Sequence, residues 1–236
     1  MSNSFSLSAL ISAVYTETNR PDLVAETLQA VLSSTLKMHG LEFFYKDILT
    51  ADVVFDIPAY LQTLDTSALP FFRSISYLRK DDPRYSAFEA SPYTGAIPPF
   101  SVNGTILPTS LARSFLKIIT PDDILDEYMA EKSDVVYQAG GTIFIRSSTS
   151  LQFANAGWYA WPNLDMANAN AGYASWIANE YPYAIIYDAA SAVLQKIGMT
   201  DAARKYDYQT PEGIQTGLVA SHVMNLRNSN ITAGGG

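Results

Sequence analysis

The chain has 236 residues, a formal net charge of −8, a pI near 4.7 and no cysteine. The lack of cysteine excludes disulfides and thiolate metal sites, and the acidic balance argues against tight nucleic-acid binding. Charged residues make up only 16% of the chain, whereas it has 15 tyrosines and 11 phenylalanines, which suits surfaces buried against partner proteins or a large core. No apolar run reaches the roughly 18 residues of a transmembrane helix, so we expect no membrane span.

Two helices are predicted in the first part of the chain. Residues 5–16 have one apolar face, and Ser4 or Ser6 could cap this helix. The second helix begins at Pro21, which suits a first helical position, and ends before Gly40. His39 lies in its last turn, where a cation is favoured, so we interpret this histidine as structural. A dense aromatic block follows.

The middle of the chain is rich in Pro, Gly and β-branched residues and predicts strands. Pro58 is expected to stop the first strand, Gly140-Gly141 to close a hairpin and residues 147–149 to form a turn. Residues 110–120 fit a helix or a strand equally well. The strand candidates are 52–57, 71–78, 100–102, 105–107, 135–138, 142–146, 151–153 and 158–161.

Helical patterns return after Pro162. The predicted segments are 169–180, 181–197, 202–206 and 210–227, and Gly198 ends the second of them. Residues 228–236 are small, polar and Gly-rich, and predict a flexible C-terminal tail. The sequence therefore predicts an α+β fold. In it, residues 1–45 and 163–236 form a helical bundle, and residues 46–162 are an inserted antiparallel β-rich domain.

The residues offer little catalytic chemistry. No phosphate-binding loop, GxSxG or HExxH motif occurs, and we expect no catalytic residue, metal or cofactor. The acidic segment 122–127 could supply the paired acids of glycoside cleavage, but the first turns of a solvated helix explain it better. Trp158, Tyr159 and Trp161 could form a sugar platform, although a subunit interface is the favoured interpretation.

Three stretches resemble head-to-tail adaptor proteins of tailed bacteriophages, the neck or connector proteins of the portal-adaptor and tail-tubular families. The first runs from Asn19-Arg20-Pro21-Asp22 through Glu26-Thr27, Lys37 and His39 to Phe43–Asp47. The second, 134–162, has a Tyr, a Gly pair, a β meander and an aromatic cluster ending in Pro. The third is EYPYAIIYD at 180–188, followed by a helix ending in Gly and by Asp201-Ala202-Ala203. Together they cover most of the chain in family-like order.

The resemblance implies a structural virion protein without catalysis. Such adaptors form a ring with themselves, usually of twelve copies, between the portal protein and the tail or nozzle/tail-terminator proteins. Genomic DNA passes through the channel without sequence-specific binding. The implied location is the virion neck, with the host cytoplasm as the site of assembly. No membrane partner is implied.

The C-terminal segment of these adaptors often extends onto the portal. Here that role carries over to residues 227–236, with Arg227, Asn228, Asn230 and Ile231 as the expected portal contacts. Two other hypotheses stay open. One is a carbohydrate-active or glycan-binding protein that uses segment 122–127 and the aromatics of 158–161, and the other is a binding module without chemistry.

Overall fold

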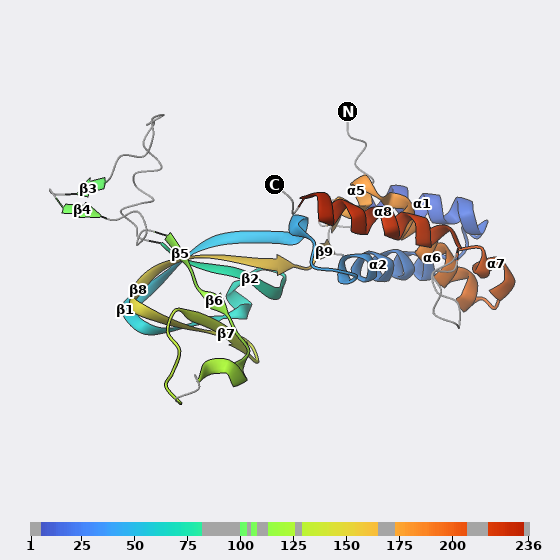
Figure 1. The fold of residues 1–236 in the computed structure, drawn as a ribbon. Helices are drawn as coiled ribbons and strands as arrows, with labels where there is room; N and C mark the ends of the chain where they lie inside the picture. The colour runs from blue at the N-terminus through green and yellow to red at the C-terminus, as the bar shows by residue number, and fades with distance from the viewer. Residues whose placement is uncertain are drawn as a thin grey trace. The chain divides into compact units, whose positions relative to one another are not determined.

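The computed structural model describes residues 6–81, 100–102, 105–107, 113–125, 129–164, 173–206 and 217–233. The chain divides into two compact units, each described by itself below (Figure 1). Unit 1 comprises Met1–Asp47 and Trp161–Gly236, and we call it the helical unit. Unit 2 comprises Ile48–Ala160, and we call it the sheet unit.

Six α-helices are described in the helical unit. They are α1 (Leu7–Thr18), α2 (Val24–Gly40), α5 (Trp176–Glu180), α6 (Pro182–Lys196), α7 (Thr200–Arg204) and α8 (Gly217–Ala233). A short 3-10 helix, η1 (Tyr45–Asp47), and a two-stranded sheet of β9 (Asn163–Leu164) and β10 (Tyr173–Ala174) complete the unit.

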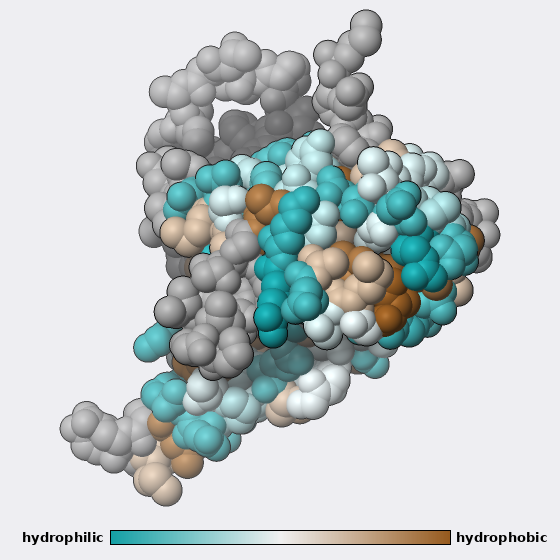
Figure 2. Space-filling model, turned by 90° about the vertical axis from the view of Figure 1, so that its right-hand side faces the viewer, coloured by the Kyte–Doolittle hydropathy of each residue, from teal (hydrophilic) through white to brown (hydrophobic). Residues whose placement is uncertain are grey.

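The helical unit has one hydrophobic core, to which both terminal parts of the chain contribute. Leu10, Val31, Ile185, Ile186 and Val223 are fully buried in it. Ser6 caps α1, since its Oγ accepts the N–H of Ala9 at 3.3 Å. Figure 2 views one side of the molecule, where patches of apolar surface lie among hydrophilic side chains.

The sheet unit is built around two long strands, β1 (Ile48–Asp65) and β8 (Thr142–Ala160). Its six-stranded sheet has the order β5-β2-β8-β7-β6, and β1 pairs with β8 beside this path. The remaining strands of the sheet are β2 (Phe72–Asp81), β5 (Arg113–Phe115), β6 (Lys117–Ile118) and β7 (Val135–Ala139). A separate hairpin joins β3 (Phe100–Val102) and β4 (Thr105–Leu107).

The predicted fold class is wrong. The chain is a mixed α/β protein, and its dominant elements are strands of 18 and 19 residues rather than a helical bundle. The sheet is mixed and not antiparallel, because β6 runs parallel to β7, with Lys117 beside Val135 and Ile118 beside Val136. Apolar alternation marks a strand but carries no information on its direction, so the sequence pattern could not reveal this pairing.

Pro58 does not end the first strand. The register with β8 jumps from Val54↔Phe153 to Ala59↔Leu151, so Pro58 lies in a bulge of an outer strand, where its missing N–H is tolerated. Gln62 stabilises the bulge, because its Nε2 donates hydrogen bonds to the carbonyls of Ile57 at 2.7 Å and Leu151 at 2.8 Å.

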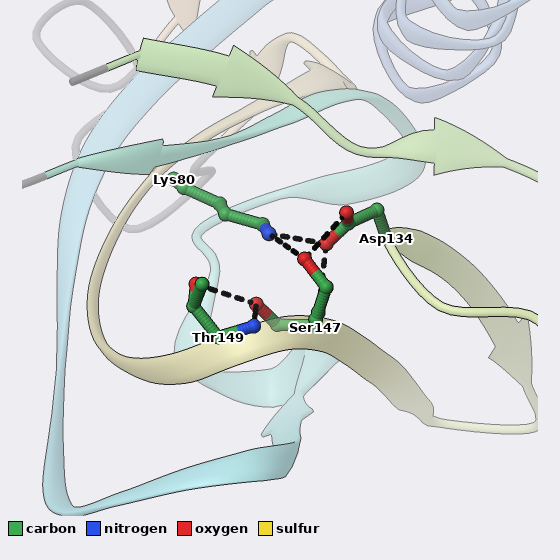
Figure 3. Close-up of polar contacts among 5 residues, drawn as sticks. Lys80, Asp134, Ser147 and Thr149 are labelled. Atoms are coloured by element: carbon green, nitrogen blue, oxygen red, sulfur yellow. Dashed lines mark hydrogen bonds and ion pairs between the residues drawn. The ribbon is translucent and has the colours of Figure 1, made fainter. Parts of the chain in front are cut away.

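The predicted turn at residues 147–149 is also wrong, because these residues continue β8. Their side chains nevertheless bond locally as in a turn: Ser147 Oγ accepts the N–H of Thr149 at 3.2 Å (Figure 3). The helix predicted for 169–180 is described only from Trp176 onward, with Ser175 as its cap, and residues 165–172 lie outside the described part.

Gly157 allows a close cross-strand contact between β8 and β2. It lies opposite Tyr77, and a Cβ at this position would come within 2.2 Å of Tyr77 Cε1. The ring of Tyr77 thus covers the bare backbone of the glycine, and its hydroxyl donates to Asn155 Oδ1 at 3.0 Å. Only glycine fits beneath this ring.

Candidate functional site

A buried polar network surrounds His39, near the end of α2. Its Nδ1 shares a hydrogen bond with Oδ1 of Asp47 at 2.8 Å, and its Nε2 shares one with Ser175 Oγ at 2.9 Å. His39 is 2% exposed, Asp47 6% and Ser175 7%. We call these three residues the His39 network. They come from the end of α2, from η1 and from the residue that caps α5.

The indole of Trp176 extends this network. Its Nε1 donates to Oδ1 of Asp47 at 2.7 Å, and its ring meets His39 edge-on with 5.9 Å between ring centroids. Among the described residues, the second oxygen of Asp47, Oδ2, is buried without a hydrogen-bond partner. Burying a carboxylate costs free energy unless hydrogen bonds compensate for the lost water, and here the bonds with His39 and Trp176 are both made by Oδ1.

The order Asp47–His39–Ser175 is that of a serine-hydrolase triad, in which the carboxylate orients the imidazole and the imidazole activates the hydroxyl. Catalysis also needs a serine that a substrate can reach, with hydrogen-bond donors for the developing oxyanion. Ser175 is buried, and its Oγ already accepts the N–H of Ala178 at 3.2 Å as the cap of α5. The geometry therefore fits a structural junction better than a nucleophile.

Two ion pairs flank the His39 network. Lys37 binds Oδ1 of Asp188 on α6, and Ser34 donates to Oδ2 of the same carboxylate at 2.7 Å. Lys46 binds the carboxylate of Glu180 at the end of α5 and lies 4.9 Å from the ring centroid of Trp176.

A further buried contact links α2 to β10. The hydroxyls of Thr35 and Tyr173 are 2.9 Å apart, and burial raises the pKa of Tyr173 above its ordinary value. The phenol therefore stays protonated and remains a hydrogen-bond donor. With the two ion pairs, this contact ties α2 and η1 to the segment that follows β9.

The residues that carry the family resemblance form these contacts with one another. Lys37 of the first stretch pairs with Asp188 of the third. Lys46 of the first pairs with Glu180 of the third. Within the first stretch, Arg20 forms a bidentate pair with Asp22, with both distances at 2.8 Å, and His39 bonds Asp47. Arg20 and Asp22 pair at the surface, whereas the other contacts join α2 and η1 to α5 and α6 or to each other.

The sequence indicated only part of this site. The structural interpretation of His39 agrees with its position in the last turn of α2. Asp47 was named as the end of a stretch that carries the family resemblance, yet it is buried in η1. Ser175 was not singled out, because 136 residues separate it from His39 and no local pattern joins them.

The three aromatic residues predicted for a subunit interface differ in their surroundings. Trp158 is 2% exposed, lies in the core of the sheet unit, and its Nε1 donates to the carbonyl of Pro70 at 3.0 Å. It leaves almost no surface for a neighbouring subunit or a sugar. Tyr159 is half-buried on β8. Trp161 is half-buried in the helical unit, where its ring lies 3.8 Å from a Cβ built on Gly40.

The expected portal contacts lie on α8. Arg227 Nε approaches Glu42 Oε1 at 3.2 Å, so its charge is partly matched within the helical unit. Asn228 is exposed on the same helix. The helix continues to Ala233 and so includes Asn230 and Ile231, whose side chains lie outside the described part.

The acidic segment 122–127 is described only in part. Asp122 and Asp123 are exposed in the 3-10 helix η3 (Pro121–Ile124), and residues 126–128 lie outside the described part. Across the described residues, no group of three or more His, Asp or Glu side chains is arranged to hold a metal ion. None of the helices that the structure describes combines the length and the apolar character needed to cross a membrane.

A second polar cluster lies in the sheet unit (Figure 3). Asp134 accepts the backbone N–H of Ser148 at 2.8 Å and its hydroxyl at 2.7 Å, and it pairs with Lys80. Partial burial raises the pKa of Asp134, but the bonds from Lys80 and Ser148 outweigh this effect and hold that pKa below its ordinary value. The cluster fixes Asp134 at φ 57°, a left-handed conformation that few residues tolerate.

Comparison with models of known protein families finds no match, and comparison with curated proteins finds none either.

Proposed function

We propose that this protein is a structural virion component, a head-to-tail adaptor that forms a ring between the portal protein and the tail. One observation carries the proposal. The charged residues that resemble those of the adaptor families pair with one another, Lys37 with Asp188 and Lys46 with Glu180. Segments that resemble those of the adaptor families in order along the chain are therefore also partners in space, as expected if they preserve a shared architecture.

The proposed partners are the portal protein, further copies of this chain in a ring of about twelve, and a tail or nozzle protein. The end of α8, with Arg227, Asn228, Asn230 and Ile231, is the proposed portal contact. The net charge of −8 suits a channel through which DNA passes without being gripped. The protein would act in the virion neck after assembly in the host cytoplasm.

The test is assembly with the portal protein of the same particle. Purified adaptor and portal ring are mixed, and complexes are counted by mass photometry. We expect a discrete species heavier than the portal ring, with a mass increase equal to a whole number of 25.8 kDa chains. Absence of such a complex, together with absence of the protein from purified particles, would contradict the proposal.

A serine hydrolase is the second candidate function, because such enzymes use the hydrogen-bond order of Asp47–His39–Ser175. The burial of Ser175 and its capping bond weigh against it. The glycan hypothesis has less support, since Trp158, the first of its proposed aromatics, is part of the core.

A further inference from the structure

β1 forms an open edge of the sheet in the sheet unit. Among the described residues it pairs only with β8, which has β2 or β7 on its other side over most of its length. The pairing is regular from Ile48 to Val54 and becomes irregular between Val54 and Leu61, around Pro58. The far side of the regular stretch therefore offers backbone N–H and C=O groups to a further strand.

The hydrophobic core of the sheet unit reaches this edge without being fully covered. Phe55 is buried in the core, whereas Ala51 and Val53 pack against it and stay partly exposed. These three side chains share the inner face of β1, because alternate residues of a strand point to the same side. Small apolar side chains on a strand docked beside β1 would lie next to Ala51 and Val53 and would extend the core.

The outer face of the same edge carries an apolar residue between two acids. Asp52, Val54 and Asp56 alternate there, and all three are exposed, Val54 by 62%. Asn155 Nδ2 donates to Oδ1 of Asp52 at 2.8 Å, which holds this carboxylate in place on the sheet. Asp56 lies where the register becomes irregular, and the long side chain of a Lys or Arg on a neighbouring strand still reaches it.

This pattern of charge selects the occupant of the edge. Opposite charges on neighbouring strands favour pairing, and like charges directly opposite disfavour it. A second copy of β1 aligned on Val54 would bring Asp52 opposite Asp56 at both ends of the contact, so β1 is poorly matched to itself. The acids instead match a strand that has Lys or Arg two residues before and two residues after an apolar residue. Such a strand meets an acid at each end in either direction.

We propose that β1 is the docking edge for an extended segment of another protein, with the pattern basic–apolar–apolar–apolar–basic. The segment joins the sheet as an additional strand. Main-chain hydrogen bonds supply affinity, and Asp52 and Asp56 select the basic residues. The bulge around Pro58 limits the pairing to the residues before it. This inference goes beyond the proposed ring, since it holds whether or not copies of the chain close into one.

Peptide binding tests the selectivity of the edge. The probe is a fluorescein-labelled peptide, Thr-Lys-Ala-Val-Ala-Lys-Thr, whose pattern reads the same in both directions, and fluorescence anisotropy measures its dissociation constant. Replacing both of its lysines with Glu should weaken binding about ten-fold, because two attractive pairs become repulsive. The peptide Lys-Lys-Ala-Thr-Val-Thr-Ala has the same composition and charge without the alternation, and should also bind more weakly. Equal binding of the three peptides, or no binding of the first, would overturn the proposal.

Charge reversal on the protein tests the two acids. Asp52→Lys with Asp56→Lys should reverse the preference, so that the Glu peptide binds more tightly than the Lys peptide. Asp122→Lys with Asp201→Lys is the matched control, since it changes the net charge equally at exposed positions outside β1. This control should keep the native preference, and a reversal there as well would assign binding to overall charge and overturn the proposal. Circular dichroism verifies that each variant is folded.

Hydrogen exchange locates the bound peptide. Saturating Lys peptide should slow the fast amides between Thr50 and Val54 several-fold, and protection confined to other segments would overturn the proposal. Val54→Cys tests a second copy as the occupant, since the chain has no cysteine of its own. The oxidised variant should stay monomeric, and disulfide-linked dimers would overturn the proposal.

The docking edge and the proposed virion function fail separately. A protein that binds the Lys peptide along β1 but is absent from purified particles would retain the edge and reject the virion function. A neck ring whose β1 binds no peptide would do the reverse.

Discussion

Lys37 and Asp188 form an ion pair between α2 and α6, and Ser34 donates a second hydrogen bond to the same carboxylate at 2.7 Å. Asp188 is 8% exposed, so its charge depends on these partners. The pair joins residues 151 positions apart in the sequence. A contact of this kind holds distant segments of the chain together, unlike an exposed ion pair between neighbouring residues.

We expect Asp188→Ala to lower the free energy of unfolding by about 1–3 kcal/mol, because Ser34 loses its acceptor and α6 loses its link to Lys37. Urea denaturation followed by circular dichroism measures the loss. Asp22→Ala is the matched control, since it breaks an ion pair at the surface and should leave the midpoint nearly unchanged. Equal effects of both changes would mean that burial of the Asp188 pair adds nothing.

A serine-reactive fluorophosphonate probe should not label Ser175, because this residue is buried and caps α5. Gel fluorescence after incubation measures labelling. Ser175→Ala should instead lower the free energy of unfolding by about 1 kcal/mol through the lost cap. Labelling of the native protein that disappears in both Ser175→Ala and His39→Gln would establish the hydrolase candidate in place of the structural one.

Gly157→Ala should destabilise the sheet unit by about 1–3 kcal/mol, because the new methyl group overlaps the ring of Tyr77. Thermal unfolding measures the change. Gly141→Ala is the control: its Cβ would meet only Thr66 Oγ1 at 3.7 Å, an ordinary contact. In the double variant with Tyr77→Ala, the glycine change should cost less than it does alone, and strict additivity would disprove the overlap.

Asp134 should make the sheet unit sensitive to acid. Its folded pKa lies below the ordinary value of 3.8, so the ionised carboxylate stabilises the fold above that pH. This contribution is lost as the pH falls through the folded pKa. The stability difference between the native protein and Asp134→Asn should therefore be largest near neutral pH and shrink in acid.

Denaturant midpoints from pH 7 down to pH 3 would show this trend. Ser148→Ala keeps the charge pair of Asp134 with Lys80 but removes a hydroxyl bond that lowers the pKa of Asp134, so it should show the same trend with pH at a smaller amplitude. A difference between the native protein and Asp134→Asn that stays constant with pH would contradict the proposed role of the carboxylate charge.

Local signals in the sequence predicted some turns and helix ends. The hairpin at Gly140-Gly141 is confirmed, with Gly140 at φ 59°, and Gly198 follows α6 at φ 80°. Of residues 110–120, left open between helix and strand, the described part from 113 on contains β5 and β6. These features depend on residues close together in the chain, which is why pattern and turn chemistry indicate them.

Features that depend on distant partners were not predicted. β6 is two residues long and owes its parallel direction to β7, so no periodicity could mark it. Pro58 stops an isolated strand in principle, but β8 supports β1 on both sides of the bulge. Ser175 gains its place in the candidate site only through a histidine 136 residues away. In each case tertiary pairing overrides the local preference.

The unequal settings of β1 and β8 should be visible in the rate at which their backbone amides exchange with deuterium. Along most of its length β8 has β1 on one side and β7 or β2 on the other, so nearly all of its amides are bonded and slow. β1 has a described neighbour on one side only, so slow and fast amides should alternate along it. The alternation should run from Thr50 to Val54, where the regular pairing of β1 with β8 is interrupted.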